Sequence, residues 1–67
     1  MKSVRRKDYH DLLALAERIY KPYGEFAVWW RGGMWNAKPI FMQPLVRVAG
    51  MKYFKFSHEA GRWIERI

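Results

Sequence analysis

The sequence contains no cysteine, no threonine and only two serines, and it has no long apolar run. Without cysteine, neither a disulfide nor a thiolate metal site can stabilise the chain. No stretch approaches the roughly 18 apolar residues of a membrane-spanning helix, so we expect no membrane partner. The basic start has no apolar segment behind it, which is unlike a signal peptide, and together with the missing cysteine this favours a cytoplasmic protein.

Residues that commonly carry out catalysis are scarce. Ser57, His58 and Glu59 are adjacent, and sequence neighbours rarely converge into a catalytic triad. Neither His10 nor His58 has the spacing of metal ligands, and the Gly32-Gly33 pair matches no phosphate-binding loop. We therefore expect a non-enzymatic protein without metal or cofactor.

A small basic ribonuclease is the one enzyme class that we keep open. Such an enzyme needs only a general acid-base and cations that stabilise the phosphate. A histidine in a surface turn, with no catalytic role, is the commoner case. The candidate residues are His58, Tyr53, Lys55 and Arg62.

Acidic residues are few, and this imbalance is the strongest functional signal. The chain has 13 Lys and Arg against six Asp and Glu, a net charge of +7 and a pI near 10.2. Between Glu25 and Glu59 there is no acidic residue, whereas five cations and eight of the 12 aromatic residues fall there. Basic residues interleaved with aromatics are typical of surfaces that bind single-stranded nucleic acid.

The aromatic residues also have a structural explanation. With 67 residues the chain is one domain, and folding must remove roughly 4,000 Å² of apolar surface from water to offset the lost chain entropy. Large rings supply much of that area, at about 150–250 Å² each. Most of the four tryptophans are therefore expected to serve the core.

An amphipathic helix is predicted near the N-terminus. Apolar residues recur at helical spacing, Asp8 can cap the first turn, and Pro22 with Gly24 ends the helix. Ser3 is an alternative cap. Residues 1–7 form a basic lead-in, either a solvated tail or a flexible arm that meets phosphates. The apolar positions are Tyr9, Leu12, Leu13, Ala16, Ile19, Tyr20 and Tyr23.

From Glu25 the apolar period changes to two, and Gly32-Gly33 predicts a two-residue hairpin loop. This loop pairs Trp30 with Trp35, and we expect both indoles on the core face with Phe26 and Val28. Trp29 then points the other way. Its expected neighbours on this outer face are Ala27, Arg31, Met34, Asn36 and Lys38.

The C-terminal half is less sharply defined. Pro44 interrupts the pattern, and residues 45–49 form a short strand or an ordered loop. Residues 51–57 alternate again, with Phe54 and Phe56 on one side. Residues 58–61 either close a hairpin onto 62–67, with Gly61 in the left-handed conformation, or begin a helix capped by Ser57. The many β-formers after Gly61 favour the hairpin.

The expected fold is α+β, with one N-terminal amphipathic helix packed on an antiparallel sheet of three to four strands. The favoured function is binding of single-stranded nucleic acid or RNA. A protein-binding inhibitor or adaptor, of the kind phages and mobile elements encode, is the alternative, with an acidic protein surface as partner. The chain is a monomer or a homodimer. The proposed binding residues are Trp29, Arg31, Lys38, Arg47, Lys52, Tyr53, Lys55, Arg5, Arg6 and Lys7, with Lys52 the weakest because it alternates with Phe54.

Overall fold

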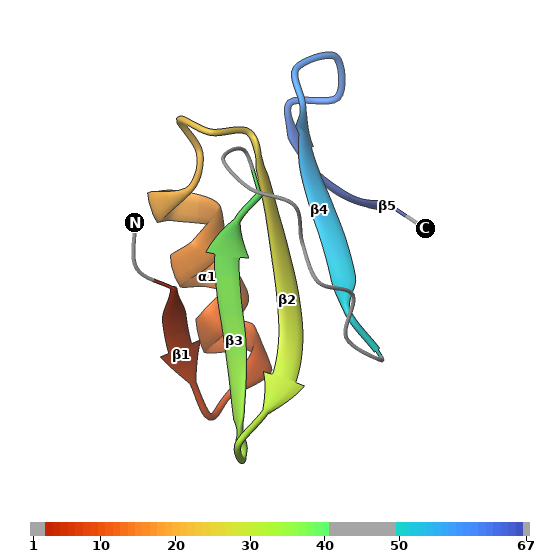
Figure 1. Ribbon diagram of the computed structural model, residues 1–67. Coiled ribbons are helices and arrows are strands. Elements are labelled where there is room, and N and C mark those ends of the chain that lie inside the picture. Colours follow the sequence, from red (N-terminus) through yellow and green to blue (C-terminus); the bar gives the residue numbers. More distant parts are fainter. Residues whose placement is uncertain (1–2, 41–49, 67) are drawn as a thin grey trace.

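A computed structural model describes residues 3–40 and 50–66, which form one helix and a five-stranded antiparallel sheet (Figure 1). The α+β class is confirmed, and the expected three to four strands were too few. The sheet order is β1-β3-β2-β4-β5. The elements are β1 Val4–Arg6, α1 Tyr9–Ile19, β2 Glu25–Arg31, β3 Met34–Pro39, β4 Lys52–Ser57 and β5 Arg62–Arg66.

The additional strand is β1, which lies within the segment expected to be a basic lead-in. It pairs with the outer edge of β3, with Val4 opposite Ala37 and Arg6 opposite Trp35. Only Val4 contributes an apolar contact to the core. A strand of three residues is too short to show a periodic pattern, and its partner is about thirty residues away in the chain, so the sequence carried little sign of it.

Helix α1 begins and ends as its flanking residues predict. The Asp8 carboxylate accepts a hydrogen bond from the Asp11 backbone N–H at 2.9 Å, which confirms it as the N-cap. At the other end, the amides of Tyr23 and Gly24 both donate to the Tyr20 carbonyl, at 3.0 and 3.1 Å. Gly24 has a φ of +79°, a conformation that glycine adopts without strain, and the chain there turns from the helix into β2.

Tyr20 connects the helix end to the sheet. Its side chain is fully buried, and its hydroxyl donates to the Ala37 carbonyl at 3.2 Å. Burial raises the pKa of Tyr20 above 10.0, although a hydrogen bond with the Val4 backbone opposes this shift. Because Val4 and Ala37 are cross-strand partners, the hydroxyl lies where β1 joins β3.

The β2–β3 hairpin has the register that the two glycines predict. Trp30 faces Trp35, Val28 faces Ala37 and Phe26 faces Pro39. Both loop residues take positive φ, +65° at Gly32 and +73° at Gly33. The loop therefore fixes which side chains of each strand share a face.

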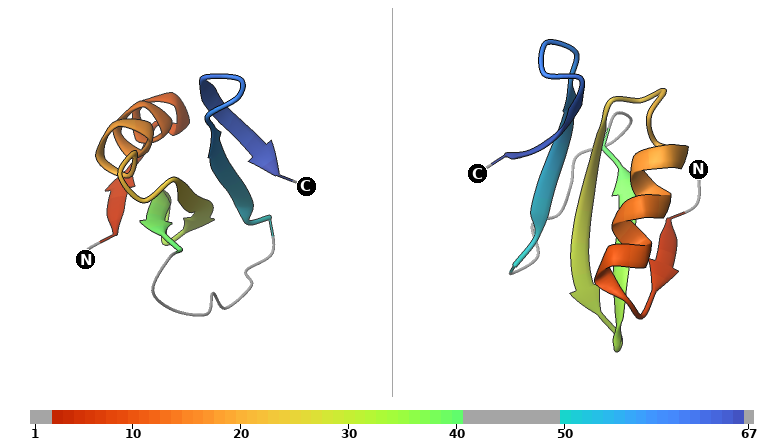
Figure 2. Two further views of the ribbon diagram at one scale, coloured as in Figure 1. Left: turned by 90° about the horizontal axis from the view of Figure 1, so that it is seen from above. Right: turned by 180° about the vertical axis from the view of Figure 1, so that it is seen from behind.

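One face of the sheet packs on α1, as the views in Figure 2 show. Phe26 stacks on Phe54 at 5.1 Å between ring centroids, and the Trp63 indole meets Phe26 edge-on at 4.9 Å. The buried cluster consists of Leu12, Ala16, Tyr20, Phe26, Val28, Ala37 and Phe54.

Trp30 does not belong to that core, which corrects the expectation for one of the two paired indoles. Trp35 packs against the cluster, but the Trp30 side chain is 51% exposed. The two rings still meet edge to face at 5.4 Å. Alternation places Trp30 on the helix side, but the residue lies next to the hairpin turn, beyond the part of β2 that the core covers.

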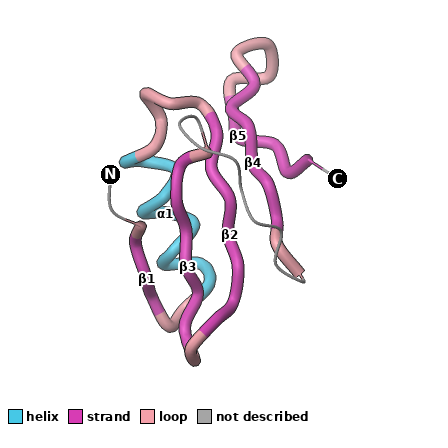
Figure 3. The backbone as a smooth tube through the Cα atoms, viewed as in Figure 1, coloured by secondary structure: helices cyan, strands magenta, loops and turns pink. Residues whose placement is uncertain are grey.

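The C-terminal ambiguity is resolved in favour of the hairpin, which appears as strands β4 and β5 in Figure 3. Gly61 has a φ of +70°, and its amide donates to the Ser57 carbonyl at 2.7 Å. The Ser57 hydroxyl accepts from the Ala60 amide at 3.0 Å, so it caps a turn and not a helix. The expectations for Pro44 and residues 45–49 lie outside the described residues.

Candidate functional site

The sheet face opposite α1 collects most of the cations on the strands. Because directly opposed residues share a face, the pairings of Arg5 with Asn36, Ala27 with Lys38 and Tyr53 with Arg66 place their side chains together. We call this surface the basic sheet face. Its cations are Arg5, Arg31, Lys38, Lys55, Arg62 and Arg66, its aromatic residues are Trp29 and Tyr53, and Glu25 is the acidic residue among the described strands there.

The other acidic residues of the described structure lie outside the basic sheet face, at several separate positions. Asp8 caps α1, Asp11 and Glu17 lie on the helix, and Glu65 shares the helix side of the sheet with its partner Phe54. Glu59 lies in the turn between β4 and β5. The charge is thus segregated, with a cationic sheet face on one side and a mixed helix surface on the other.

One row of side chains runs across the middle of the basic sheet face. Lys38 of β3, Ala27 of β2, Tyr53 of β4 and Arg66 of β5 are successive cross-strand partners. Three strand spacings separate the two cations at its ends, which is about 14 Å. Trp29 is a diagonal neighbour of Tyr53, at about 7–8 Å. The two aromatic residues therefore lie between cations.

Exposure varies across this face. Arg5, Arg31 and Lys55 are exposed, as are Arg62 and Arg66, whereas Lys38, Trp29 and Tyr53 are half-buried.

Two residues expected to point outward here, Ala27 and Asn36, are buried. The small side chain of Ala27 is flanked by Lys38 and Tyr53. The Asn36 amide donates to the carbonyls of Arg31 at 3.2 Å and Met34 at 3.0 Å, so it serves the hairpin itself.

Two further predicted site residues lie on the helix side, away from the basic sheet face. The Lys52 ammonium lies over the Tyr9 ring at 5.0 Å, as its alternation with Phe54 suggested. Arg6 is opposite Trp35, and its guanidinium donates to the Arg5 carbonyl at 2.7 Å.

The three other predicted binding residues are Arg5, Lys7 and Arg47. Arg5 belongs to the basic sheet face, and its guanidinium comes within 3.3 Å of where a Cβ on Gly32 would stand. Lys7 is exposed after β1, and Arg47 lies outside the described residues.

Two features of the surface were not expected. Arg62 and Arg66 belong to the basic sheet face because β5 pairs with β4. The β-forming residues after Gly61 predict both positions once the hairpin is chosen over the helix. On the helix side, Trp35 contacts both Tyr9 at 4.7 Å and the exposed Trp30 at 5.4 Å. The exposure of Trp30 had no sequence signal, because alternation predicts a face and not the extent of the core.

The ribonuclease candidates are only partly brought together. His58 and Lys55 line one surface pocket at the β4–β5 hairpin. Arg62 is the first residue of β5, next to the turn, and there it also borders a different pocket beside α1. Tyr53 lines neither of the two pockets. Within residues 3–40 and 50–66, no three His, Asp or Glu side chains are grouped as metal ligands. In the same residues no helix has the length and apolar character needed to cross a membrane.

Comparisons with protein-family models, with curated proteins and with solved structures gave no match.

Proposed function

We propose that this protein is a non-enzymatic binding module for single-stranded nucleic acid, and that it binds through the basic sheet face. The observation that supports this most is the charge segregation. Six cations share the basic sheet face with Trp29 and Tyr53, and Glu25 is the acidic residue among the described strands there. Cations neutralise phosphates in a sequence-independent way, and aromatic rings stack on unpaired bases.

A single strand suits this surface better than a duplex groove. Grooves of DNA are commonly entered by a helix whose exposed side carries cations and polar groups. The described helix has Asp11 and Glu17 together with Arg18 away from the core, so its outer side is of mixed charge. A twisted sheet with half-buried rings offers stacking positions to bases that are already unpaired.

The test compares two neighbouring indoles that point to opposite faces. Trp29→Ala removes a stacking ring from the basic sheet face and is expected to weaken binding of a mixed-sequence oligonucleotide about 5- to 150-fold. Trp30→Ala is the matched control, because it removes the more exposed indole from the helix side. Fluorescence anisotropy with a labelled 12-mer measures both affinities.

The salt dependence of binding tests the electrostatic part of the proposal. Each phosphate contact contributes about 0.7 to the slope of log affinity against log salt, so six contacts give a slope of about −4. Absence of binding at low salt would rule out the proposed function. A larger loss for Trp30→Ala than for Trp29→Ala would place the contact surface on the helix side.

A protein-binding inhibitor or adaptor is the second candidate, and the half-exposed Trp30 indole favours it. Tryptophan is enriched among the residues that dominate protein interfaces, and this one is 51% exposed beside Trp35 and Tyr9. A nuclease-treated host lysate passed over immobilised protein tests this candidate. A protein that the wild type and Trp29→Ala retain but Trp30→Ala does not would support this candidate. A protein that both variants fail to retain would count against it.

A further inference from the structure

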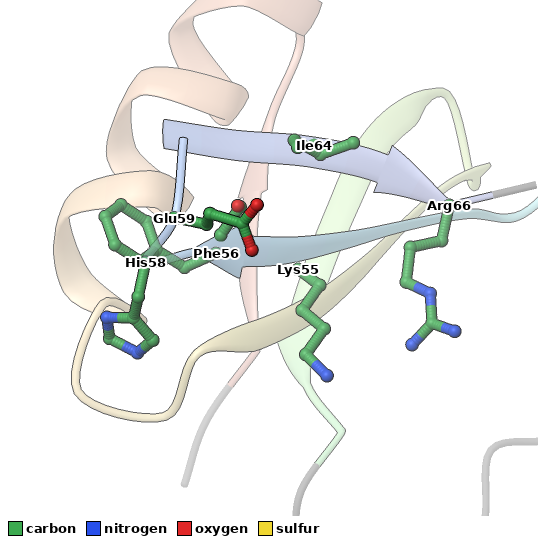
Figure 4. Close-up of a pocket in the computed structure, with 7 residues that line it drawn as sticks. Lys55, Phe56, His58, Glu59, Ile64 and Arg66 are labelled. Carbon is green, nitrogen blue, oxygen red and sulfur yellow. The ribbon is translucent and has the colours of Figure 1, made fainter. Parts of the chain in front are cut away.

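The β4–β5 hairpin forms a surface pocket of about 410 Å³, shown in Figure 4. Its lining includes Lys55 and Arg66 of the basic sheet face, the apolar side chain of Ile64, and His58 with Glu59 from the turn. Sites for small molecules are commonly about 300–1,000 Å³ and mostly apolar with a few converging polar groups. The size and the lining both fit one nucleotide.

The cations of this pocket suit a phosphate group. Lys55 is opposite Ile64, and Arg66 is two residues further along β5, which makes the two cations diagonal neighbours at about 7–8 Å. In Figure 4 both side chains extend to the same side of the hairpin. A guanidinium binds two phosphate oxygens at once, and the lysine adds a point charge. His58 extends to the same side and carries a ring N–H that can donate.

Glu59 gives the pocket a direction. Its carboxylate repels phosphate, and so does that of Glu25, the cross-strand partner of Lys55 in β2. A phosphate is therefore favoured on the β5 side of Lys55, toward Arg66. A carboxylate accepts hydrogen bonds from the amino and imino groups of bases. Ile64 is 41% exposed and offers an apolar wall to the sugar. An oligonucleotide that continued past the turn would bring a second phosphate close to the Glu59 carboxylate. The pocket therefore favours the end of a nucleic-acid strand over its middle.

We propose that this pocket binds the phosphorylated terminal nucleotide of the single strand, an inference that rests on the proposed function. Arg66 is the cross-strand partner of Tyr53, and Trp29 is the diagonal neighbour of Tyr53, so the strand continues from the pocket onto these rings. A terminal phosphate monoester carries close to two negative charges at pH 7, against one for a diester. The cation pair therefore distinguishes a phosphorylated end from a hydroxyl end.

The experiment uses three otherwise identical oligonucleotides that carry a 5′-phosphate, a 3′-phosphate or no terminal phosphate. We expect the full chain to bind one phosphorylated form about tenfold more tightly than the hydroxyl form. Lys55→Gln and Arg66→Gln should each reduce that ratio toward one. Arg62→Gln is the matched control for Arg66→Gln, because it removes the same charge from the same strand, β5, at a residue outside this pocket.

The outcomes separate this inference from the proposed function. Equal affinity for all three oligonucleotides, with binding otherwise intact, overturns the pocket assignment and leaves the binding function standing. The assignment is also overturned if both the Lys55 and the Arg66 variants keep the preference for a phosphorylated end. The same holds if Arg62→Gln reduces that preference as much as they do. Failure to bind any of the oligonucleotides overturns the proposed function itself. Circular dichroism of each variant confirms that it is folded.

Discussion

Replacing Tyr20 by phenylalanine tests how the N-terminal strand is held to the sheet. The substitution keeps the buried ring, which lies 5.9 Å from Phe26, and removes the hydroxyl that donates to the Ala37 carbonyl at 3.2 Å. It also removes the hydrogen bond between that hydroxyl and the Val4 backbone. Each lost hydrogen bond costs about 1 kcal/mol, and a buried group left without its partner can raise the cost to as much as about 3 kcal/mol. We therefore expect a loss of about 1–2 kcal/mol in the free energy of unfolding.

Thermal unfolding at pH 7 is a suitable assay. For a domain of this size 1 kcal/mol corresponds to a fall of about 4–8 °C in Tm, so Tyr20→Phe should melt at least about 4 °C below the wild type. Tyr9→Phe is the control, because it keeps the ring 4.7 Å from Trp35. Equal Tm values for wild type and Tyr20→Phe would refute the argument that this hydroxyl stabilises the β1–β3 junction.

The pH dependence gives the same substitution a second readout. Burial raises the pKa of Tyr20 in the folded state above the ordinary value of 10.0. Above that pH the unfolded chain loses the proton first, so the stability contributed by the neutral hydroxyl is complete below pH 10 and declines as the pH rises further. The stability difference between wild type and Tyr20→Phe should therefore narrow above pH 10. A difference that widened there would contradict the raised pKa.

Two further predictions concern a turn and a face assignment. Gly61→Ala should lower the free energy of unfolding by about 1 kcal/mol or more, because alanine is strained at a φ of +70°, and Gly61→Asn should lower it less. Urea unfolding measures both variants, and equal losses would contradict the left-handed conformation of Gly61. Lys52→Gln should weaken nucleic-acid binding less than Arg31→Gln does, because Lys52 lies over Tyr9 on the helix side. Anisotropy titrations at one salt concentration compare the two affinities. Equal losses of affinity would show that both sides of the sheet contact the oligonucleotide.

Much of the local structure could be predicted because short stretches of sequence determine it. Asp8 is followed by an apolar period of helical spacing, and capping needs only a side chain and the first turn. Gly32 and Gly33 permit positive φ at both loop positions, which fixed the β2–β3 register without knowledge of the rest of the chain. The same reasoning favoured the β4–β5 hairpin through Gly61.

The features that were missed depend on contacts distant in sequence. Strand β1 is defined by its pairing with β3 and by the Tyr20 hydroxyl, and three residues carry no periodic pattern of their own. Trp30 has the face that alternation predicts, but whether the core extends that far depends on where α1 lies. Arg66 reaches the candidate site only because β5 pairs with β4, a choice the sequence left open.

The central claim is that the basic sheet face, and not the helix side, contacts nucleic acid. The indole N–H signals of the four tryptophans, followed by NMR while a single-stranded oligonucleotide is added, test it most directly. We predict that the Trp29 signal shifts most, while Trp30 on the opposite face changes little despite its greater exposure. A dominant shift at Trp30 with an unmoved Trp29 would contradict the account.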